Sequence, residues 1–517
     1  MRINSLVTAA VVVIFSTMFV MPQQKANVYV PDEVLIKIDS SASARRSVES
    51  LVGEGANVIE KWTDIGWQRV RIPPGLTVEE ALQHYQEFDG VLTVQPNFYY
   101  HLLAIPNDPQ FTSAGMYGLG KISAPQAWDL TTGSSAVVVA DIDTGMRYTH
   151  QDLAANAWVN PGEIAANGVD DDNNGFIDDV RGWDFFYNDS NPIDDAGGHG
   201  THTAGTIGAV GNNLLNVVGV NWNVKIMPIK IYSPNGGDST SAMLVNAYNY
   251  VRMMKVRGVN IRVTNNSYGG CGEACGYDQA TKDALDAMGD AGILNVFAAG
   301  NSNANNDVNP SGAYPSVYTS PSILAVASST STDAKSSFSS YGLISVDVAA
   351  PGSSVLSTYN TSDTATATLS GTSMATPHAA GAAALLSAYN PNLSVASLKA
   401  SLMNTVDPLP AWTSLVRSGG RLNVFAALQN QTVCTFNLST QAVSVRTKGG
   451  YYSVDVTAPR NCDFSLKSNA NWIKLSTSNV GSSNGTISFR VGVNPGISRV
   501  GTITVAGQTV TVTQSRG

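Results

Sequence analysis

Three short segments stand out for the chemistry that their side chains could do together. Asp143-Thr144-Gly145 directly follows a nearly continuous apolar run at 136–142. Residues 198–202 (Gly-His-Gly-Thr-His) and 371–378 (Gly-Thr-Ser-Met-Ala-Thr-Pro-His) each open a stretch of small residues with helical composition. A serine hydroxyl is a poor nucleophile until a neighbouring base takes its proton. An imidazole can be that base, and a carboxylate can fix the imidazole tautomer.

Each segment alone has a simpler interpretation. An Asp-Thr-Gly after a strand is often only a turn, and Ser373 at the start of a helix would usually be an N-cap. His199 and His202 are spaced like metal ligands, although the glutamate of the H-E-x-x-H pattern is absent. Spacing does not choose between these two histidines. The joint occurrence, in the order Asp, His, Ser along the chain, is far more specific than any one part.

With the three segments in this order, the chain resembles the subtilisin family of secreted serine proteases. The resemblance implies that Asp143 is the orienting carboxylate, His199 the general base and Ser373 the nucleophile. It leaves His202 and His378 with structural roles. It also implies hydrolysis of peptide bonds in protein or peptide substrates through an acyl-enzyme. A catalytically inactive homologue would need a broken set, and every position is intact.

Two more segments resemble the family's oxyanion-binding and substrate-binding segments. Residues 298–301 (Ala-Ala-Gly-Asn) follow an expected strand, and Asn301 aligns with the donating amide. In subtilisin itself such a donor stabilises the transition state by roughly 3–4 kcal/mol. Residues 265–270 (Asn-Asn-Ser-Tyr-Gly-Gly) resemble the strand whose backbone pairs with an extended peptide. We expect an apolar or tolerant specificity pocket walled by Ser267, Tyr268, Gly269, Ala298, Ala299 and Gly300.

Asp141 departs from the family pattern, which usually has an aliphatic residue at this position. It lies two residues before Asp143, and such residues of a strand face the same way. Two neighbouring carboxylates raise one of the two pKa values. Asp141 is therefore paired, metal-bound or neutral, and the sequence leaves these alternatives open.

An Asp-rich insert between Asp143 and His199 predicts a calcium site. Counted from Asp170, positions 3 and 5 are Asp172 and Asn174 and position 6 is a glycine, as at the start of a calcium loop. Position 12 is arginine rather than glutamate, which argues against a true EF-hand. A solvated acidic loop is the alternative. The candidate ligands are Asp170, Asp172, Asn174, Asp178 and Asp179.

A second structural calcium site rests on the family resemblance. Asp152 and Asn213 match positions that bind calcium through side chains, and Leu215 and Val217 match positions that bind it through carbonyls. Calcium is the expected cofactor, because it would hold surface loops and slow self-digestion.

The order of the expected elements divides the chain into four parts. Residues 1–26 are typical of a signal peptide, because Arg2 precedes an uncharged apolar run that is short for a membrane span. An uncleaved anchor is the alternative to secretion. Residues 27–104 predict a ferredoxin-like α+β unit, with a helix that opens at the capping box Thr77-x-x-Glu80. This unit resembles an inhibitory propeptide, which would block the cleft as an intramolecular inhibitor until it is cut away between about Tyr100 and Ala114. A permanent accessory domain is the alternative.

The remaining two parts differ in their patterns. Residues 105–430 alternate strands and helices, which predicts an α/β fold with a doubly wound, mostly parallel sheet. Catalytic groups would then lie at the carboxyl ends of its strands. Residues 432–517 carry short alternating β runs and resemble a BACON-like β-sandwich, through Cys462 and the Asn-Trp-Ile at 471–473 among other features. A glycan or glycoprotein is the expected ligand of this domain. An adhesin that acts mainly through it is the alternative function, and a core position is the alternative for Trp472.

Cysteines and charge limit the remaining classes. The four cysteines fall as Cys271 with Cys275 and Cys434 with Cys462, which suits two local disulfides in an exported protein, with free thiols as the alternative. Net charge is −9 and no basic block occurs, which argues against nucleic acid as a partner. A hydrophobic content of 43% is enough for a sizeable core. We expect a monomer.

Overall fold

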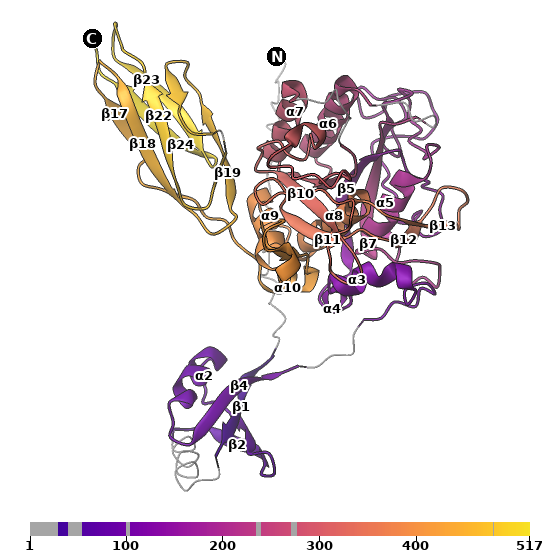
Figure 1. Cartoon of the computed structure of the whole chain (residues 1–517), viewed down its shortest axis with the longest axis vertical. Coiled ribbons are helices and arrows are strands. Elements are labelled where there is room, and N and C mark those ends of the chain that lie inside the picture. The colour runs from indigo at the N-terminus through magenta and orange to yellow at the C-terminus, as the bar shows by residue number, and fades with distance from the viewer. Residues whose placement is uncertain (1–28, 40–53, 100–103, 234–238, 270–276, 479) are drawn as a thin grey trace, which may run out of the picture. The chain divides into compact units, whose positions relative to one another are not determined.

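The computed structural model describes residues 29–39, 54–99, 104–233, 239–269, 277–478 and 480–517. The chain divides into two compact units, Met1–Leu102 and Leu103–Gly517, and each is described by itself (Figure 1). The predicted signal peptide and the pair Cys271 and Cys275 lie outside the described residues. Within the described residues, no helix has the length and apolar character needed to cross a membrane.

The first unit is a four-stranded antiparallel sheet with one described helix. The strands run in the order β2-β3-β1-β4. Thr77 and Glu80 form the predicted capping box, in which the Thr77 N–H donates to the Glu80 carboxylate at 2.9 Å. The core contains Val34, Ile36 and Tyr85. The element bounds are β1 (Tyr29–Ile38), β2 (Asn57–Trp62), β3 (Trp67–Arg71), α2 (Val78–Gln86) and β4 (Val91–Phe98).

The second unit is built on a nine-stranded sheet in the order β14-β15-β11-β10-β9-β8-β5-β7-β6. Neighbours from β6 to β15 pair in parallel, and β14 pairs with β15 antiparallel. The strands are β5 (Gly133–Asp143), β6 (Trp183–Asp184), β7 (Asn223–Lys230), β8 (Ile261–Asn266), β9 (Leu294–Ala298), β10 (Ile323–Ser329), β11 (Val348–Pro351), β14 (Asp407–Pro408) and β15 (Gly420–Arg421). A separate hairpin is formed by β12 (Val355–Thr358) and β13 (Thr366–Leu369).

Helices cover both faces of this sheet. Successive residues of β5 show the division, because Val139 packs in one core cluster with α8 and Ala140 packs in another with Tyr248 of α6. The predicted doubly wound α/β fold is therefore confirmed. The helices are α3 (Tyr117–Lys121), α4 (Ala124–Trp128), α5 (His199–Gly208), α6 (Ser241–Val256), α7 (Gln279–Asp290), α8 (Thr372–Tyr389), α9 (Val395–Asn404) and α10 (Val424–Gln429), with 3₁₀ turns η1 (Ala114–Met116), η2 (Pro310–Gly312) and η3 (Pro410–Trp412).

The C-terminal part of the second unit is the predicted β-sandwich. Its sheets have the orders β16-β18-β22-β20 and β17-β24-β23-β19-β21. Inward residues such as Phe464, Phe489 and Val512 form one core between them. The strands are β16 (Asn437–Leu438), β17 (Ala442–Val445), β18 (Gly450–Thr457), β19 (Asp463–Ser468), β20 (Ile473–Leu475), β21 (Val480–Ser482), β22 (Gly485–Val491), β23 (Arg499–Val505) and β24 (Gln508–Gln514).

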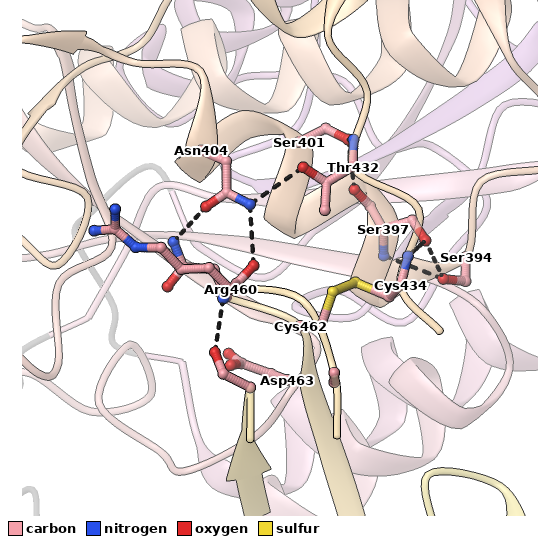
Figure 2. The surroundings of a disulfide bond; sticks show 12 residues. Ser394, Ser397, Ser401, Asn404, Thr432, Cys434, Arg460, Cys462 and Asp463 are labelled. Carbon is pink, nitrogen blue, oxygen red and sulfur yellow. Dashed lines mark hydrogen bonds between the residues drawn. A yellow bond between two sulfur atoms is a disulfide. The ribbon is translucent and has the colours of Figure 1, made fainter. Parts of the chain in front are cut away.

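Hydrogen bonds beside a disulfide join the start of the sandwich to α9 (Figure 2). Cys434 and Cys462 are bonded, with Cα atoms 5.5 Å apart. The Cys434 N–H donates to the Ser397 hydroxyl on α9 at 3.0 Å, and the Asn404 side chain at the end of α9 donates to the Arg460 carbonyl at 3.0 Å. The predicted Cys434–Cys462 disulfide is confirmed.

An ion cluster lies at the same junction. Asp463, the first residue of β19, accepts from Arg417 at 2.8 Å and from Lys399 on α9 at 3.0 Å. Asp347 lies 3.4 Å from the Lys399 ammonium and completes the cluster. The side chains of Lys399 and Asp463 are each 4% exposed. Such buried charges require one another, so this contact fixes how the sandwich packs on the rest of the unit.

Candidate active site

Neighbouring strands bring the candidate residues to one edge of the sheet. β5 ends at Asp143, β8 ends directly before Ser267, and β9 ends just before the turn that carries Asn301. α5 begins at His199, and Ser373 is the second residue of α8. Because β9, β8 and β5 are adjacent and parallel, their carboxyl ends meet, and the two helix starts complete the group.

Asp143 and His199 form a close pair. The imidazole Nδ1 lies 2.7 Å from the Asp143 Oδ1 atom, and the carboxylate side chain is 1% exposed. An ionised carboxylate only accepts, so Nδ1 carries the proton and Nε2 is left as the base. Burial opposes the charged imidazolium, but the charge and hydrogen bond of Asp143 outweigh it and raise the pKa of His199. The pair therefore has the geometry of a general base and its orienting carboxylate.

The turn after β5 holds this pair in place. The Thr144 N–H donates to Asp143 Oδ1 at 2.7 Å, and the Thr144 hydroxyl accepts from the Gly200 N–H at 2.8 Å. Gly145 has a φ of +98°, and a side chain there would meet the Pro192 carbonyl. The Asp-Thr-Gly turn thus ties the end of β5 to the start of α5.

Ser373 and Ser267 exchange hydrogen bonds between the start of α8 and the end of β8. The Ser373 hydroxyl donates to the Ser267 carbonyl at 2.9 Å, and the Ser267 hydroxyl donates to the Ser373 carbonyl at 3.0 Å. The α8 start also supplies backbone N–H groups that have no partner within the helix. A hydroxyl at such a helix start lies in a field that favours developing negative charge.

Asn301 is oriented by the residue that precedes Ser373. Its side-chain oxygen accepts from the Thr372 N–H at 2.8 Å and from the Thr372 hydroxyl at 2.9 Å. The amide nitrogen of Asn301 is therefore left to donate on the side of the nucleophile. The Thr372 hydroxyl also accepts from the Gly300 N–H at 3.2 Å, which fixes the turn.

A cavity of about 410 Å³ adjoins Ser373 and Asn301. Five of the six predicted pocket residues line it, together with Ser302, Gly312, Ala313 and Thr372, which sequence reasoning did not single out. Ala299 is the exception, because its side chain is buried in a cluster with Trp412. Tyr268 is tied by hydrogen bonds of its hydroxyl to Tyr248 at 2.6 Å and Asn266 at 2.9 Å. No charged side chain is among the described lining residues.

The other two histidines of these segments are buried. The Nε2 atom of His202 lies 3.0 Å from the Val355 carbonyl, and the Nδ1 atom of His378 lies 2.9 Å from the Met374 carbonyl. Burial lowers the pKa of each to about 4. Their contacts are those of neutral structural histidines.

Comparison with known proteins decides the family. The subtilase family matches residues 134–427, which is more than half of the 517-residue chain. The chain belongs to the subtilase family. Residues 16–97 match the fervidolysin N-terminal prodomain, and residues 463–515 match BACON, which is described as a putative binding domain. The protein is therefore a serine endopeptidase of the subtilisin type with an N-terminal prodomain and a C-terminal all-β domain.

Several named proteases are similar to this subtilase. Thermitase of Thermoactinomyces vulgaris is 38% identical over 324 residues, which are 63% of this chain and 99% of thermitase. An extracellular protease of Xanthomonas campestris is 32% identical over 413 residues, which are 75% of this chain and 68% of that protein. Subtilisin Savinase of Lederbergia lenta is 34% identical over 304 residues, which are 59% of this chain and 95% of Savinase.

The residues that the family resemblance assigns to a calcium site lie close together. Asp152 is fully buried, and its two oxygens accept from the Asn213 amide at 3.1 Å and from the Val217 N–H at 3.1 Å. The Leu215 N–H donates to the Asn213 side-chain oxygen at 2.8 Å. Subtilases generally bind structural calcium, and the Asp152 carboxylate and the Asn213 side-chain oxygen are ligands of the kind that this ion prefers.

Asp108 belongs to the same place and was not predicted as a ligand. Its Oδ2 atom accepts from the Asn212 N–H at 2.7 Å, and its buried Oδ1 atom has no hydrogen-bond partner among the described residues. Burial raises the pKa of Asp108, and the charge of Asp152 adds to this. Two buried carboxylates beside each other, one with an unpartnered oxygen, fit a bound cation.

The carboxylates of the acidic insert fall into two groups, those that accept from backbone N–H groups of the loop and those that cluster with one another. Asp170 accepts from the Gly175 N–H at 2.8 Å and Asp178 from the Gly168 N–H at 2.9 Å, so both hold the loop backbone. Asp172 and Asp179 gather with Glu163, each offering a carboxylate oxygen within 4.8 Å of the others.

Asn174 lies between the two groups of carboxylates. Its amide nitrogen lies 2.9 Å from the Asp179 Oδ2 atom, while its side-chain oxygen accepts from the Phe176 N–H at 2.7 Å. Burial raises the pKa of Asp179 to about 6. Glu163 was missed by sequence reasoning, because it lies before the Asp-rich run and no spacing rule includes it.

Proposed function

We propose that this subtilase is an exported endopeptidase that matures by its own activity and uses Asp143, His199, Ser373 and Asn301. One observation carries the proposal. Ser373 and the oriented Asn301 amide line one uncharged cavity, and the Asp143–His199 pair lies where β5 and α5 bring it to the same edge of the sheet.

The residues have distinct steps in acyl transfer. The Ser373 hydroxyl turns from the Ser267 carbonyl toward Nε2 of His199, loses its proton there and attacks the substrate carbonyl. The developing oxyanion accepts from the Asn301 amide and from a backbone N–H at the start of α8. His199 then gives its proton to the leaving amine, and water repeats the sequence to release the acid.

The strand ends around the cavity would bind an extended peptide. Residues 267–269 follow β8 and offer backbone groups for pairing with a substrate strand. The cavity is large and uncharged, and this favours an apolar side chain before the cleaved bond. Protein or peptide substrates of this kind are the proposed partners.

The prodomain is the proposed intramolecular inhibitor. Its family match and compact sheet support a folded inhibitory domain, and removal of this domain by Ser373 would free the cleft. We propose the cut between about 100 and 114. The apolar N-terminal run supports export, and one relative is named an extracellular protease.

Two calcium sites are proposed. Asp152, Asn213 and Asp108, with the carbonyls of Leu215 and Val217, would hold one ion. Glu163, Asp172 and Asp179 would hold the other, framed by Asp170, Asn174 and Asp178. When bound, the ions would supply positive charge and stabilise these loops by binding the folded state.

The BACON match supports a binding role for residues 432–517, with a glycan or glycoprotein as the proposed ligand. Trp472 packs against the sandwich core, and the Arg499 guanidinium lies 4.3 Å from its ring centroid. These contacts favour a core role for Trp472 over sugar stacking. An adhesin acting mainly through this domain is the second candidate function, and glycan binding by the full chain with Ser373→Ala would test it.

Intact mass after treatment with a serine-directed phosphonate tests the main proposal. The wild type should carry the label at Ser373 and lack the prodomain, whereas Ser373→Ala should be unlabelled and uncut. An unlabelled, uncut wild type would overturn the proposal. A Ser373→Ala chain that still matures in isolation would overturn self-processing alone.

A further inference from the structure

Asp141 is a fully enclosed carboxyl group beside the catalytic pair. Its exposed fraction is 1%. It lies on β5 and pairs in register with Asn265 on β8. Its Oδ2 atom lies 3.0 Å from the Thr203 hydroxyl of α5, and its Oδ1 atom accepts from the Asn265 amide at 2.8 Å. Asp141 thus contacts the helix that carries His199 and the strand that leads to the substrate.

The hydrogen bonds of the Thr203 hydroxyl indicate the protonation state of Asp141. The Thr203 hydroxyl lies 3.0 Å from Asp141 Oδ2 and also 3.0 Å from the Gly200 carbonyl. The hydroxyl has one proton, and a carbonyl can only accept. Both contacts are hydrogen bonds when Thr203 donates to Gly200 and a protonated Asp141 donates to Thr203.

The other oxygen of Asp141 continues the chain of hydrogen bonds to the nucleophile. The Asn265 amide has two protons, which go to Asp141 at 2.8 Å and to the Ser267 hydroxyl at 3.0 Å. The Ser267 hydroxyl donates to the Ser373 carbonyl at 3.0 Å. In this arrangement, each N–H or O–H proton in the chain from Gly200 to Ser373 makes one hydrogen bond.

We propose that Asp141 is a neutral positioning acid whose proton joins α5, which carries His199, to β8 and through it to α8, which carries Ser373. The inference rests on the proposed function and deepens it. Asp141 touches no reacting atom in this scheme. Through Thr203, it fixes the position of Gly200, the residue after His199, relative to Ser373.

The surrounding charges support the neutral form. Burial, and then the charge of Asp143, raise the pKa of Asp141 well above its ordinary value; the hydrogen bonds of Asn265 and Thr203 and the charge of His199 oppose this less strongly. The ionisable groups on the described elements packed against β5 are His199 and His202 on α5, Lys225 and Lys230 on β7, Arg262 on β8, and His378 and Tyr389 on α8. Lys230 is already paired with Asp184 and Asp195.

Ionisation at high pH would remove the donor to Thr203 and place a second negative charge beside Asp143. The start of α5 would lose a tether, and kcat would fall. The variant Asp141→Asn retains a donor for Thr203 and an acceptor for Asn265 without titrating. The variant Asp141→Val retains neither.

The experiment measures kcat and KM against pH for the wild type and both variants, with active sites counted by phosphonate labelling. Asp141→Asn should keep kcat within about twofold and lose the alkaline decline. Asp141→Val should lower kcat roughly 10- to 100-fold with KM little changed, because positioning is lost. Asp283→Asn, an exposed change on α7, is the matched control and should behave as the wild type.

Three results would overturn the inference. These are an equal loss of kcat in both variants, a wild-type kcat in Asp141→Val, and an unchanged alkaline decline in Asp141→Asn. If neither variant folds, an infrared difference spectrum between phosphonate-blocked wild type and phosphonate-blocked Thr203→Val decides. The C=O stretch of a protonated Asp141 should shift in this spectrum, because Thr203→Val removes its hydrogen-bond partner. A spectrum without that band overturns the inference. Failure of wild-type labelling would instead overturn the proposed function.

Discussion

The Ser373 hydroxyl donates to the carbonyl of Ser267, the residue directly after β8, at 2.9 Å. A peptide that pairs with residues 267–269 would compete for this carbonyl. Its binding would release the hydroxyl to turn toward His199. In the proposed mechanism, substrate pairing and the orientation of the Ser373 hydroxyl would therefore be linked through one acceptor.

The Ser267 side chain should affect turnover more than binding. Ser267→Ala removes the donor to the Ser373 carbonyl but keeps the Ser267 backbone. We expect kcat to fall roughly five- to tenfold, the loss of about one hydrogen bond of 1–1.5 kcal/mol, with KM little changed. Steady-state kinetics on a peptide substrate measure this. Ser302→Ala, which removes a cavity hydroxyl bonded to Ser340 instead, should leave kcat near the wild type. An effect on KM alone in Ser267→Ala would contradict the assignment.

Asn301 should act in the transition state. Asn301→Leu removes the amide that Thr372 orients, and kcat should fall about 10²- to 10³-fold with little change in KM. Phosphonate labelling of the same preparation confirms that the site is assembled. Asn392→Leu, an exposed asparagine after α8, is the control. A variant with full kcat would show that another group binds the oxyanion.

The acid side of the pH profile should report His199. Burial lowers its pKa, but Asp143 outweighs burial and the net pKa lies above 6.5. The base must be neutral to take the Ser373 proton, so kcat/KM should rise with pH through a value above 6.5. A pH series with a small peptide ester and a peptide amide measures it. A midpoint below 6.5 for both substrates would contradict the raised pKa.

The main architecture and the four catalytic candidates followed from the sequence, because buried parallel strands end where the motifs begin. Contacts across elements did not follow. The bond between Asp141 and Thr203 depends on how α5 packs over β5, and no spacing rule encodes it. Asp108 joins Asp152 from a distant segment in the same way.

Ala299 was wrongly predicted to line the pocket, although the sequence carried a pattern that argues against it. Alternate residues of an extended segment face opposite sides, so Ala298 and Gly300 can line the cavity while Ala299 points into the core. The alternation alone would have removed Ala299 from the expected pocket wall. The missed residues Gly312 and Ala313 come from the end of the 3₁₀ turn η2, whose position beside the cavity no pattern in the sequence indicates.

Calcium removal should destabilise the mature enzyme through Asp152 and Asp108. Removal of calcium from phosphonate-blocked protein with a chelator should lower the Tm. Free calcium at about 100 times the Kd stabilises the folded state by roughly 2.7 kcal/mol, and chelation removes this stabilisation. Asp152→Ala and Asp108→Ala should each reduce the response to added calcium, and Asp283→Asn should keep it. Differential scanning calorimetry and calcium titration give both readouts. A response that survives in both variants would place the ion elsewhere.

The last prediction concerns the ion cluster that fixes the sandwich. Burial disfavours the charged form of Asp463, but the charge of Lys399 and the hydrogen bonds of Arg417 hold its pKa well below the usual range. Because the folded pKa is depressed, this stabilisation is complete above the unfolded value of about 3.9 and is lost as pH falls below it. Asp463→Ala leaves Lys399 buried without its partner and should cost roughly 3–5 kcal/mol of unfolding free energy.

Chemical denaturation of phosphonate-blocked enzyme at pH 7 and at lower pH tests this cluster. Lys467→Ala, an exposed change on the same strand as Asp463, should be close to neutral. The difference between wild type and Asp463→Ala should shrink as pH falls toward the pKa of the folded carboxyl. A difference that is small at pH 7, or constant with pH, would show that the cluster does not hold the sandwich in place.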